Sequence, residues 1–225
     1  PLNYVTVDGV TTNPLADIAK SNFVNNGQID WNAMYLANQN SVNAGKSVYA
    51  LYEDRTDDKQ YSANTILFSN ITDNITLNAG ATYRKLKSHN YQKLQDLLGG
   101  QYFLDVDPFY SGDQTQSDLI TPNRRIEVGD TYGYNYNLNA DVFDVFTQFK
   151  FNYKKFDYYL AQTFSKSEYQ REGLYKNGIY PNSSLGDSKR VSFENFGFKG
   201  GLTYKVTGQH YLSFNGAYMS KAPGM

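Results

Sequence analysis

The sequence predicts an all-β chain that forms a segment of an antiparallel transmembrane β-barrel. Apolar and polar residues alternate along several segments, most clearly from Phe193 to Tyr204. Because successive side chains of a strand point to opposite faces, such a segment has one apolar face and one polar face. The connections between these segments are alternately short and long, as in outer-membrane barrels. The 21 Tyr and 14 Phe suit a surface whose rings lie in lipid and whose hydroxyls stay wet.

The composition excludes several other classes of protein. The chain has 225 residues, a formal net charge of −1 and no cysteine. No apolar run approaches the ~18 residues of a membrane-spanning helix, which excludes a helical membrane protein. The near-zero charge argues against a nucleic-acid partner, and the lack of cysteine excludes disulfides and thiolate metal sites. A soluble, Tyr-rich β-sandwich is the alternative class, because binding surfaces are also rich in tyrosine.

Residues 1–60 are expected to form an extracellular loop region with a short helix and a first strand. The helix is predicted at Ile29–Asn38, where Ile29, Ala33 and Leu36 lie near one face. The chain opens without a starting Met, a basic region or an apolar signal segment. An exported barrel needs such a signal, so we expect the native N-terminus to lie upstream.

Residues 61–225 are expected to hold the barrel strands. Tyr61–Asn70 and the alternating segment from Ile75 to Arg84 flank a short polar turn and predict a hairpin. After a long loop at 89–130, alternation returns at Tyr132. The apolar parity then changes near Val142 and Phe143, and this slip predicts a β-bulge.

Two further hairpins complete the strand pattern. Lys154 and Lys155 form a tight turn before a strand that begins at Phe156, and a second long loop is predicted at 173–189. The last two strands are joined at 206–210. In outer-membrane barrels the short turns are periplasmic and the long loops extracellular, so 89–130 and 173–189 are expected to lie outside the cell.

These segments amount to about six to eight strands, which we expect to form an open arc. The first ~45 residues contain no strand pattern that could pair with the last strand and close the sheet. Lipid does not tolerate unpaired backbone at a sheet edge. We therefore expect two bare edges in this chain, completed by strands outside it.

The end of the last strand, Ala217–Pro223, resembles the mid-barrel segment of TonB-dependent outer-membrane receptors. There an aromatic strand commonly ends in Tyr-x-x-x-Arg-Ala-Pro, and this chain has Tyr218 and, in place of Arg, Lys221. The segment Phe198–Tyr204 is similar to receptors of the Bacteroidetes type. The resemblance implies an internal fragment of a barrel of about 22 strands in the bacterial outer membrane, which transports a nutrient or chelate.

The same resemblance implies the partners of the chain. These are outer-membrane lipid, a plug domain, a TonB-type energy-coupling protein and a surface lipoprotein. The alternative function is that of a barrel serving as scaffold or adhesin in an envelope complex, whose loops bind protein. The surrounding reading frame separates the two, because a plug domain with a TonB-interaction segment favours transport.

Few residues suggest chemistry. Asp105 and Asp107 place two carboxylates on one side of an extended segment, as in a small Ca²⁺ site, but no full set of oxygen ligands can be identified. We therefore expect no metal and no cofactor. Aromatic residues of the expected loops could stack on a sugar or chelate, or pack the loops together: Trp31, Tyr102, Phe103, Phe109, Tyr110 and Tyr180.

Enzyme activity is not expected. His210 lies in a predicted turn, and His89 at the mouth of a loop has no recognisable nucleophile or carboxylate partner. The apolar parity predicts these lipid-facing residues: Phe151, Phe156, Phe164, Phe196, Phe198, Leu202, Leu212 and Phe214. The other parity predicts these lumen-facing residues: Asn78, Arg84, Asp144, Lys150, Asp157 and Lys199.

Overall fold

The computed structural model describes residues 5–7 and 10–224. Predictions that fall on 1–4, 8–9 and Met225 lie outside these residues. The chain is 56% strand and 13% helix, with antiparallel sheets, which confirms the all-β class. It divides into two compact units, one made of Pro1–Leu51 with Asp96–Phe103 and the other of Tyr52–Gln95 with Leu104–Met225.

The first unit holds the helices. Its elements are β1 (Val5–Val7), β2 (Val10–Thr12), α1 (Pro14–Asn26), α2 (Trp31–Gln39) and the 3₁₀ helix η1 (Ser41–Asn43). The helix predicted at 29–38 is confirmed as α2, whereas α1 was not predicted. The signals for α1 are local: the Asn13 side chain accepts from the amide of Ala16 at 3.1 Å, and Gly27 ends the helix at a φ of +60°.

The side chain of Asn38 links three segments of the first unit by hydrogen bonds. Its side chain is buried and donates to the carbonyl oxygens of Tyr49 and Leu97, each at 2.8 Å. Its own oxygen accepts from the amides of Val48 and Tyr49 at 2.7 and 2.9 Å. One buried amide therefore joins α2 to two segments that are remote in sequence, and satisfies backbone groups that burial would otherwise leave unpaired.

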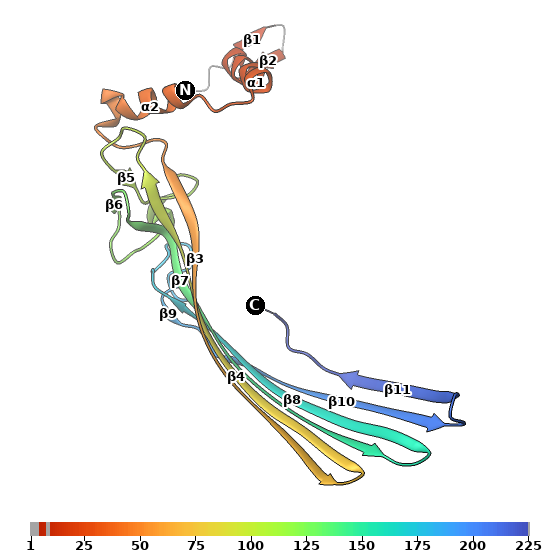
Figure 1. Cartoon of the computed structure of the whole chain (residues 1–225). Coiled ribbons are helices and arrows are strands. Elements are labelled where there is room, and N and C mark those ends of the chain that lie inside the picture. Colours follow the sequence, from red (N-terminus) through yellow and green to blue (C-terminus); the bar gives the residue numbers. More distant parts are fainter. Residues whose placement is uncertain (1–4, 8–9, 225) are drawn as a thin grey trace. The chain divides into compact units, whose positions relative to one another are not determined.

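The second unit is built on a long antiparallel sheet (Figure 1). Its strand order follows the chain, and each strand pairs with the next: β3 (Leu51–Thr72), β4 (Ile75–Asp96), β7 (Thr131–Asn152), β8 (Phe156–Gly173), β10 (Val191–Lys205) and β11 (Tyr211–Met219). The short strand β9 (Gly186–Asp187) pairs with β8. A separate small sheet joins β5 (Phe103–Leu104) to β6 (Arg125–Ile126), and η2 (Gly112–Thr115) lies between them in sequence.

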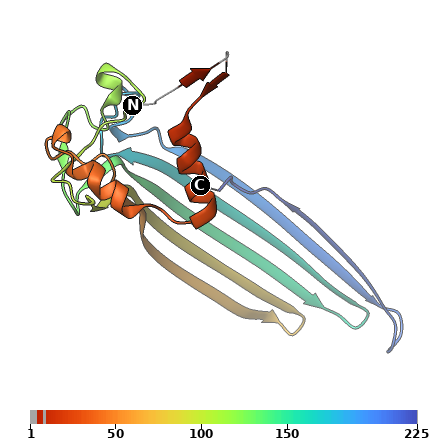
Figure 2. The ribbon, with the colours of Figure 1, turned by 90° about the horizontal axis from the view of Figure 1, so that it is seen from above.

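The connections of the long sheet are sorted by length. The links at 73–74, 153–155 and 206–210 lie at one end, and the connections at 97–130 and 174–190 follow the opposite strand ends (Figure 2). The three short links agree with the prediction. The loop predicted to start at His89 starts later, because β4 continues to Asp96 and pairs His89 with Asn137 of β7. This end of β4 carries polar residues on both faces, so alternation did not reveal it, although its partner segment on β7 was predicted from Tyr132 onward.

The β-bulge predicted at Val142 and Phe143 is wrong. Pairing is continuous there, with Val142 opposite Ser167 and Phe143 opposite Lys166. The parity changes because the surroundings of one regular strand change along its length. The register shift between β4 and β7 lies nearer the long connections, where Tyr91 pairs with Asn135 and Gln92 pairs with Tyr132.

The sheet is open, as predicted. Among the described residues, β3 and β11 each pair with a single long strand, β4 and β10 respectively. In this unit the buried apolar side chains are Leu94, Ile126, Tyr132 and Ala140. All four belong to the half of the sheet that bears the long connections or to those connections themselves, so no apolar core covers the hairpin half in the part of the chain described.

Candidate membrane interface

The hairpin half of the sheet has one apolar face. Paired residues of neighbouring strands share a face, so the register identifies its members. They are Ile75, Leu77, Ala79, Ala81 and Tyr83 on β4; Phe143, Val145, Thr147, Phe149 and Phe151 on β7; Phe156, Tyr158, Leu160, Gln162 and Phe164 on β8; Phe196, Phe198, Gly200, Leu202 and Tyr204 on β10; Leu212, Phe214, Gly216 and Tyr218 on β11. All eight residues predicted to face lipid lie on this face.

The apolar face has the same height on β4, β7, β8 and β10. It covers nine residues on β4, from Ile75 to Tyr83, and nine on β10, from Phe196 to Tyr204. At ~3.3 Å per residue this is about 27 Å along the strand, close to the ~9–11 tilted residues that cross a bilayer. Large side chains on it are solvent-exposed in the chain alone, for example Phe198 at 54% and Phe214 at 66%. An exposed apolar surface of this extent calls for a partner.

Aromatic rings border the apolar face at both ends. Next to the hairpin turns, Phe151 stacks on Tyr158 with ring centroids 4.4 Å apart, and Phe156 stacks on Tyr204 at 4.9 Å. At the opposite border, the rings of Phe164 and Phe196 lie 5.1 Å apart. Two aromatic girdles around an apolar band are typical of membrane barrels, since rings prefer the headgroup level.

The opposite face of the same strands is polar. Arg84 pairs with Asp144 at 2.9 Å, and Lys205 pairs with Asp157 at 2.7 Å. The six residues predicted to face a lumen all lie on this face, by the same register. Phe146 is the exception, and its ring lies against Gly80, where a Cβ atom would come within 2.5 Å of it. The glycine thus leaves space for an apolar ring on a face that is otherwise mainly polar.

Beyond the apolar band, charged residues line the strands. Glu172 of β8 accepts from Asn137 at 2.8 Å and from Lys87 at 3.3 Å, and these bonds hold the pKa of Glu172 below its usual range. Burial and a hydrogen bond to Asp54 raise the pKa of Tyr134 to about 12. This half of the sheet is therefore suited to water, and the change at Phe143 marks where one environment gives way to the other.

The long connections of the second unit bind to one another. We call residues 104–130 and 174–190 the loop cluster. The amide of Leu119 donates to the carbonyl of Lys176 at 2.7 Å, and the amide of Gly178 donates to the carbonyl of Gln116 at 2.9 Å. The Asp118 carboxylate also accepts from the amide of Lys176 at 3.1 Å. Backbone hydrogen bonds of this kind hold the two connections as one body.

Arg124 links the loop cluster to β7, and no local pattern in the sequence predicts this role. Its guanidinium donates to Asp105 at 2.7 Å, to the carbonyl of Thr131 at 2.6 Å and to the hydroxyl of Tyr175 at 3.0 Å. Burial opposes the charge of Arg124, but the hydrogen bonds with Tyr175 and Asp105 outweigh it and raise its pKa. A fixed cation is therefore built into the chain at this point.

The two candidate Ca²⁺ ligands have other roles. The Asp105 carboxylate is 3% exposed and accepts from Arg124 and from the amide of Gly133. Asp107 accepts from the amide of Phe109 at 3.0 Å, which is ordinary turn chemistry. Within the described residues, no three His, Asp or Glu side chains are grouped in a way that could hold a metal ion.

The six aromatic candidates do not form one described site. Trp31, Tyr102 and Phe103 belong to the first unit. Of the others, Phe109 is 92% exposed and Tyr180 is 65% exposed on the loop cluster, and Tyr110 is exposed as well. His89 is part of the strand pairing: its Nε2 lies 2.7 Å from Asn135 Oδ1, and its ring stacks on Tyr91.

No helix in the described part of the chain is long and apolar enough to cross a membrane. A scan against protein-family models gives no match, and neither does a comparison with curated proteins or with solved structures.

Proposed function

We propose that this sheet is a section of the wall of a transmembrane β-barrel in a bacterial outer membrane. The observation that carries the proposal is the apolar band, which has the same nine-residue height on neighbouring strands and lies opposite a polar face. The aromatic girdles and the sorting of connections by length support it further. On this proposal the apolar face contacts lipid, the polar face lines the lumen and the loop cluster is extracellular.

Within such a barrel, we propose TonB-dependent uptake of a nutrient or chelate as the activity. The support is the resemblance of the segment Ala217–Pro223 to the mid-barrel segment of that receptor family. The chain then supplies part of the wall and the outer loops, and no covalent chemistry. A plug domain, a TonB-type coupling protein and a surface lipoprotein are the partners of this proposal.

A scaffold or adhesin is the second candidate, and one observation favours it. Phe109, Ile120 and Tyr180 project exposed apolar side chains from loops that are hydrogen-bonded to each other. Rigid, exposed aromatic residues are typical of surfaces that bind protein. The reading frame around the chain separates the candidates: a plug domain with a TonB-interaction segment supports uptake, and a frame that encodes neither favours the scaffold.

The membrane proposal is tested by placing charge on each face. Phe198→Arg puts a cation inside the apolar face, two residues from the middle of the band at Gly200, and is expected to cost ~2–4 kcal/mol in folding titrations in lipid bilayers. Thr203→Arg is the matched control on the polar face of the same strand and is expected to cost much less. Gly197 is a poor control, because any side chain there would overlap the Thr163 hydroxyl. Equal costs at Phe198 and Thr203 would refute the membrane wall.

A further inference from the structure

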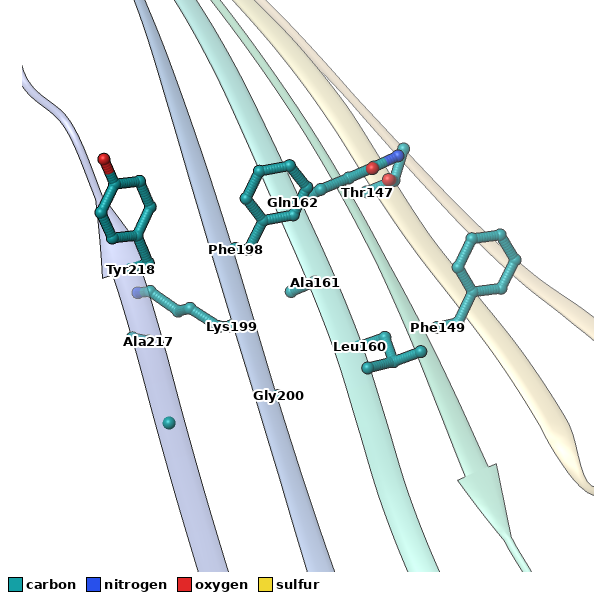
Figure 3. Close-up of a pocket in the computed structure, with 11 residues that line it drawn as sticks. Thr147, Phe149, Leu160, Ala161, Gln162, Phe198, Lys199, Gly200, Ala217 and Tyr218 are labelled. Carbon is teal, nitrogen blue, oxygen red and sulfur yellow. The ribbon is translucent and has the colours of Figure 1, made fainter.

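A groove crosses the apolar face where β10 and β11 lack side chains. Gly200, which lies beside Leu160 and Phe198 in Figure 3, pairs with Gly216 of β11. A Cβ atom on Gly216 would meet nothing within 4 Å, and one on Gly200 would lie 3.5 Å from Leu160 Cδ2, an ordinary van der Waals contact. Two adjoining hollows of about 540 and 580 Å³ meet along this row. Phe198 borders the groove on one side, Leu202 borders it on the other, and Leu160 of β8 closes its flank. The groove is apolar and wide enough for a hydrocarbon chain.

A basic cluster, made of Lys154 and Lys155, lies at the turn end of the same strands. The carbonyl of Lys155 accepts from the amide of Lys205 at 2.9 Å, which places the 153–155 turn beside β10. The Lys205 ammonium is held by Asp157 and by the carbonyl of Tyr153. Lys154 and Lys155 are exposed, and no described residue forms an ion pair with either of them. Lys205 and Asp157 pair with each other on the polar face, so the charges of Lys154 and Lys155 are not neutralised by an ion pair within the part of the chain described.

The other hairpin turns differ in charge. The 73–74 turn carries Asp73 and no basic residue, and the 206–210 turn carries no Lys or Arg. The basic cluster is therefore specific to the turn that leads into Tyr158 and Leu160, the β8 residues that line the groove. From Lys155 to Leu160 is five residues, or about 16 Å at ~3.3 Å per residue. That is close to the ~15 Å depth of one hydrocarbon leaflet.

We propose that the groove and the basic cluster together bind one anionic phospholipid. The phosphate lies at Lys154 and Lys155, and one acyl chain runs past Tyr158 into the hollow over Gly200. Charge complementarity selects the anionic headgroup, because lysines at a membrane surface attract anionic lipid. The proposal rests on the proposed membrane wall and adds a selective site to it.

The test uses the intact protein in lipid nanodiscs, with Trp31→Phe removing the single native tryptophan. A new tryptophan is placed in the groove by Leu202→Trp. Ile75→Trp is the control on the same apolar face but outside the groove, since the register Ile75, Phe151, Tyr158, Leu202 forms one row across four strands. The bilayers mix phosphatidylglycerol and phosphatidylcholine, with bromine on the acyl chains of one lipid at a time to quench fluorescence.

At Leu202→Trp, brominated phosphatidylglycerol is expected to quench with about tenfold higher apparent affinity than brominated phosphatidylcholine. At Ile75→Trp the two lipids are expected to quench alike. Lys154→Gln with Lys155→Gln is expected to remove the preference, whereas Lys59→Gln with Lys189→Gln, an equal loss of charge elsewhere, is expected to keep it.

Three results would overturn the proposal, and they can be told apart. Equal quenching by both lipids at both positions would exclude the selective site and leave the membrane wall standing. A preference that survives the loss of Lys154 and Lys155 would exclude the basic cluster as its cause. Absence of quenching at both positions would refute the proposal that the apolar face contacts lipid.

Discussion

The backbone amide of Gly133 donates to the carboxylate of Asp105 at 3.0 Å, across 28 residues of sequence. Gly133 lies in the register shift between β4 and β7, with a φ of +67°. A bulge turns an amide out of the ladder, and glycine adopts this conformation without strain. The freed amide and the guanidinium of Arg124 then share one buried carboxylate, so an irregularity of the sheet becomes the anchor of the loop cluster.

This anchor gives the first prediction. Arg124→Met leaves the Asp105 carboxylate buried without its cation, and is expected to lower the free energy of local opening of the loop cluster by about 1.5–3 kcal/mol. Hydrogen exchange of the Leu119 and Gly178 amides, which bridge the two connections, measures the change. Adding Asp105→Asn to the Arg124→Met variant removes the unpaired charge and is expected to restore part of the lost free energy of opening. Unchanged exchange in Arg124→Met would contradict the anchor.

The second prediction concerns the first unit. Asn38→Ala removes a buried side chain that makes five hydrogen bonds to five backbone groups of four residues, and is expected to destabilise that unit by about 1–3 kcal/mol. Limited proteolysis between α2 and β3 reports the loss. Asn40→Ala, which removes an exposed side chain that accepts a hydrogen bond from the amide of Val42, is the control and is expected to have a smaller effect. Equal sensitivity in both variants would argue against the role of Asn38.

The third prediction concerns sidedness. Single cysteines are clean probes because the native chain has none. An impermeant maleimide on whole cells is expected to label Ser111→Cys and Ser183→Cys and to spare Asp73→Cys and Gly208→Cys. All four positions are exposed in the structure, whereas the neighbouring Ser184 is buried and would be a misleading probe. Labelling only at the hairpin turns would reverse the proposed orientation.

The fourth prediction is a dependence on pH. The pKa of Glu172 lies below its usual 4.5 in the folded chain, owing to hydrogen bonds from Asn137 and Lys87. Its contribution to stability is therefore fully present above about pH 4.5 and is lost as the pH falls through the lower, folded pKa. Because the group is partly solvated, the contribution is about 0.2–1 kcal/mol.

The measurement is the denaturant midpoint against pH, compared between the native chain and Glu172→Gln. The two curves are expected to differ above pH 4.5 and to converge below it. Curves that stay parallel across this range would show that Glu172 contributes no pH-dependent stability.

The sequence predicted the hairpin half of the sheet well, for a physical reason. There one face of each strand is apolar and the other is polar, so residues such as Phe196 and Asn195 alternate strictly. Alternation fails where both faces are polar, which is why the sequence predicts a loop at the polar end of β4. At Phe143 the apolar parity changes along a regular strand, and periodicity alone cannot distinguish such a change from a bulge. Helix α1 was missed although Asn13, Pro14 and Gly27 mark its ends, because its apolar residues follow no strict period.

The loop cluster was predicted least. Asp105 was singled out as a carboxylate, but its partner Arg124 lies 19 residues away and no local pattern joins them. Likewise, the basic cluster at Lys154 and Lys155 is plain in the sequence, whereas the groove that it adjoins depends on Gly200 lying opposite Gly216. Relationships of this kind depend on register and on tertiary pairing, which composition and periodicity do not contain.

The order of the long strands in the sheet is the same as their order along the chain, from β3 to β11. Each hairpin therefore pairs with the preceding hairpin along one edge strand, and no later segment has to insert between two strands that are already paired. Removing or duplicating a whole hairpin would change the circumference of a wall built this way while leaving every other strand pair in register. Such an architecture can be resized in steps of two strands, and its width can vary between related chains without any rewiring of the fold.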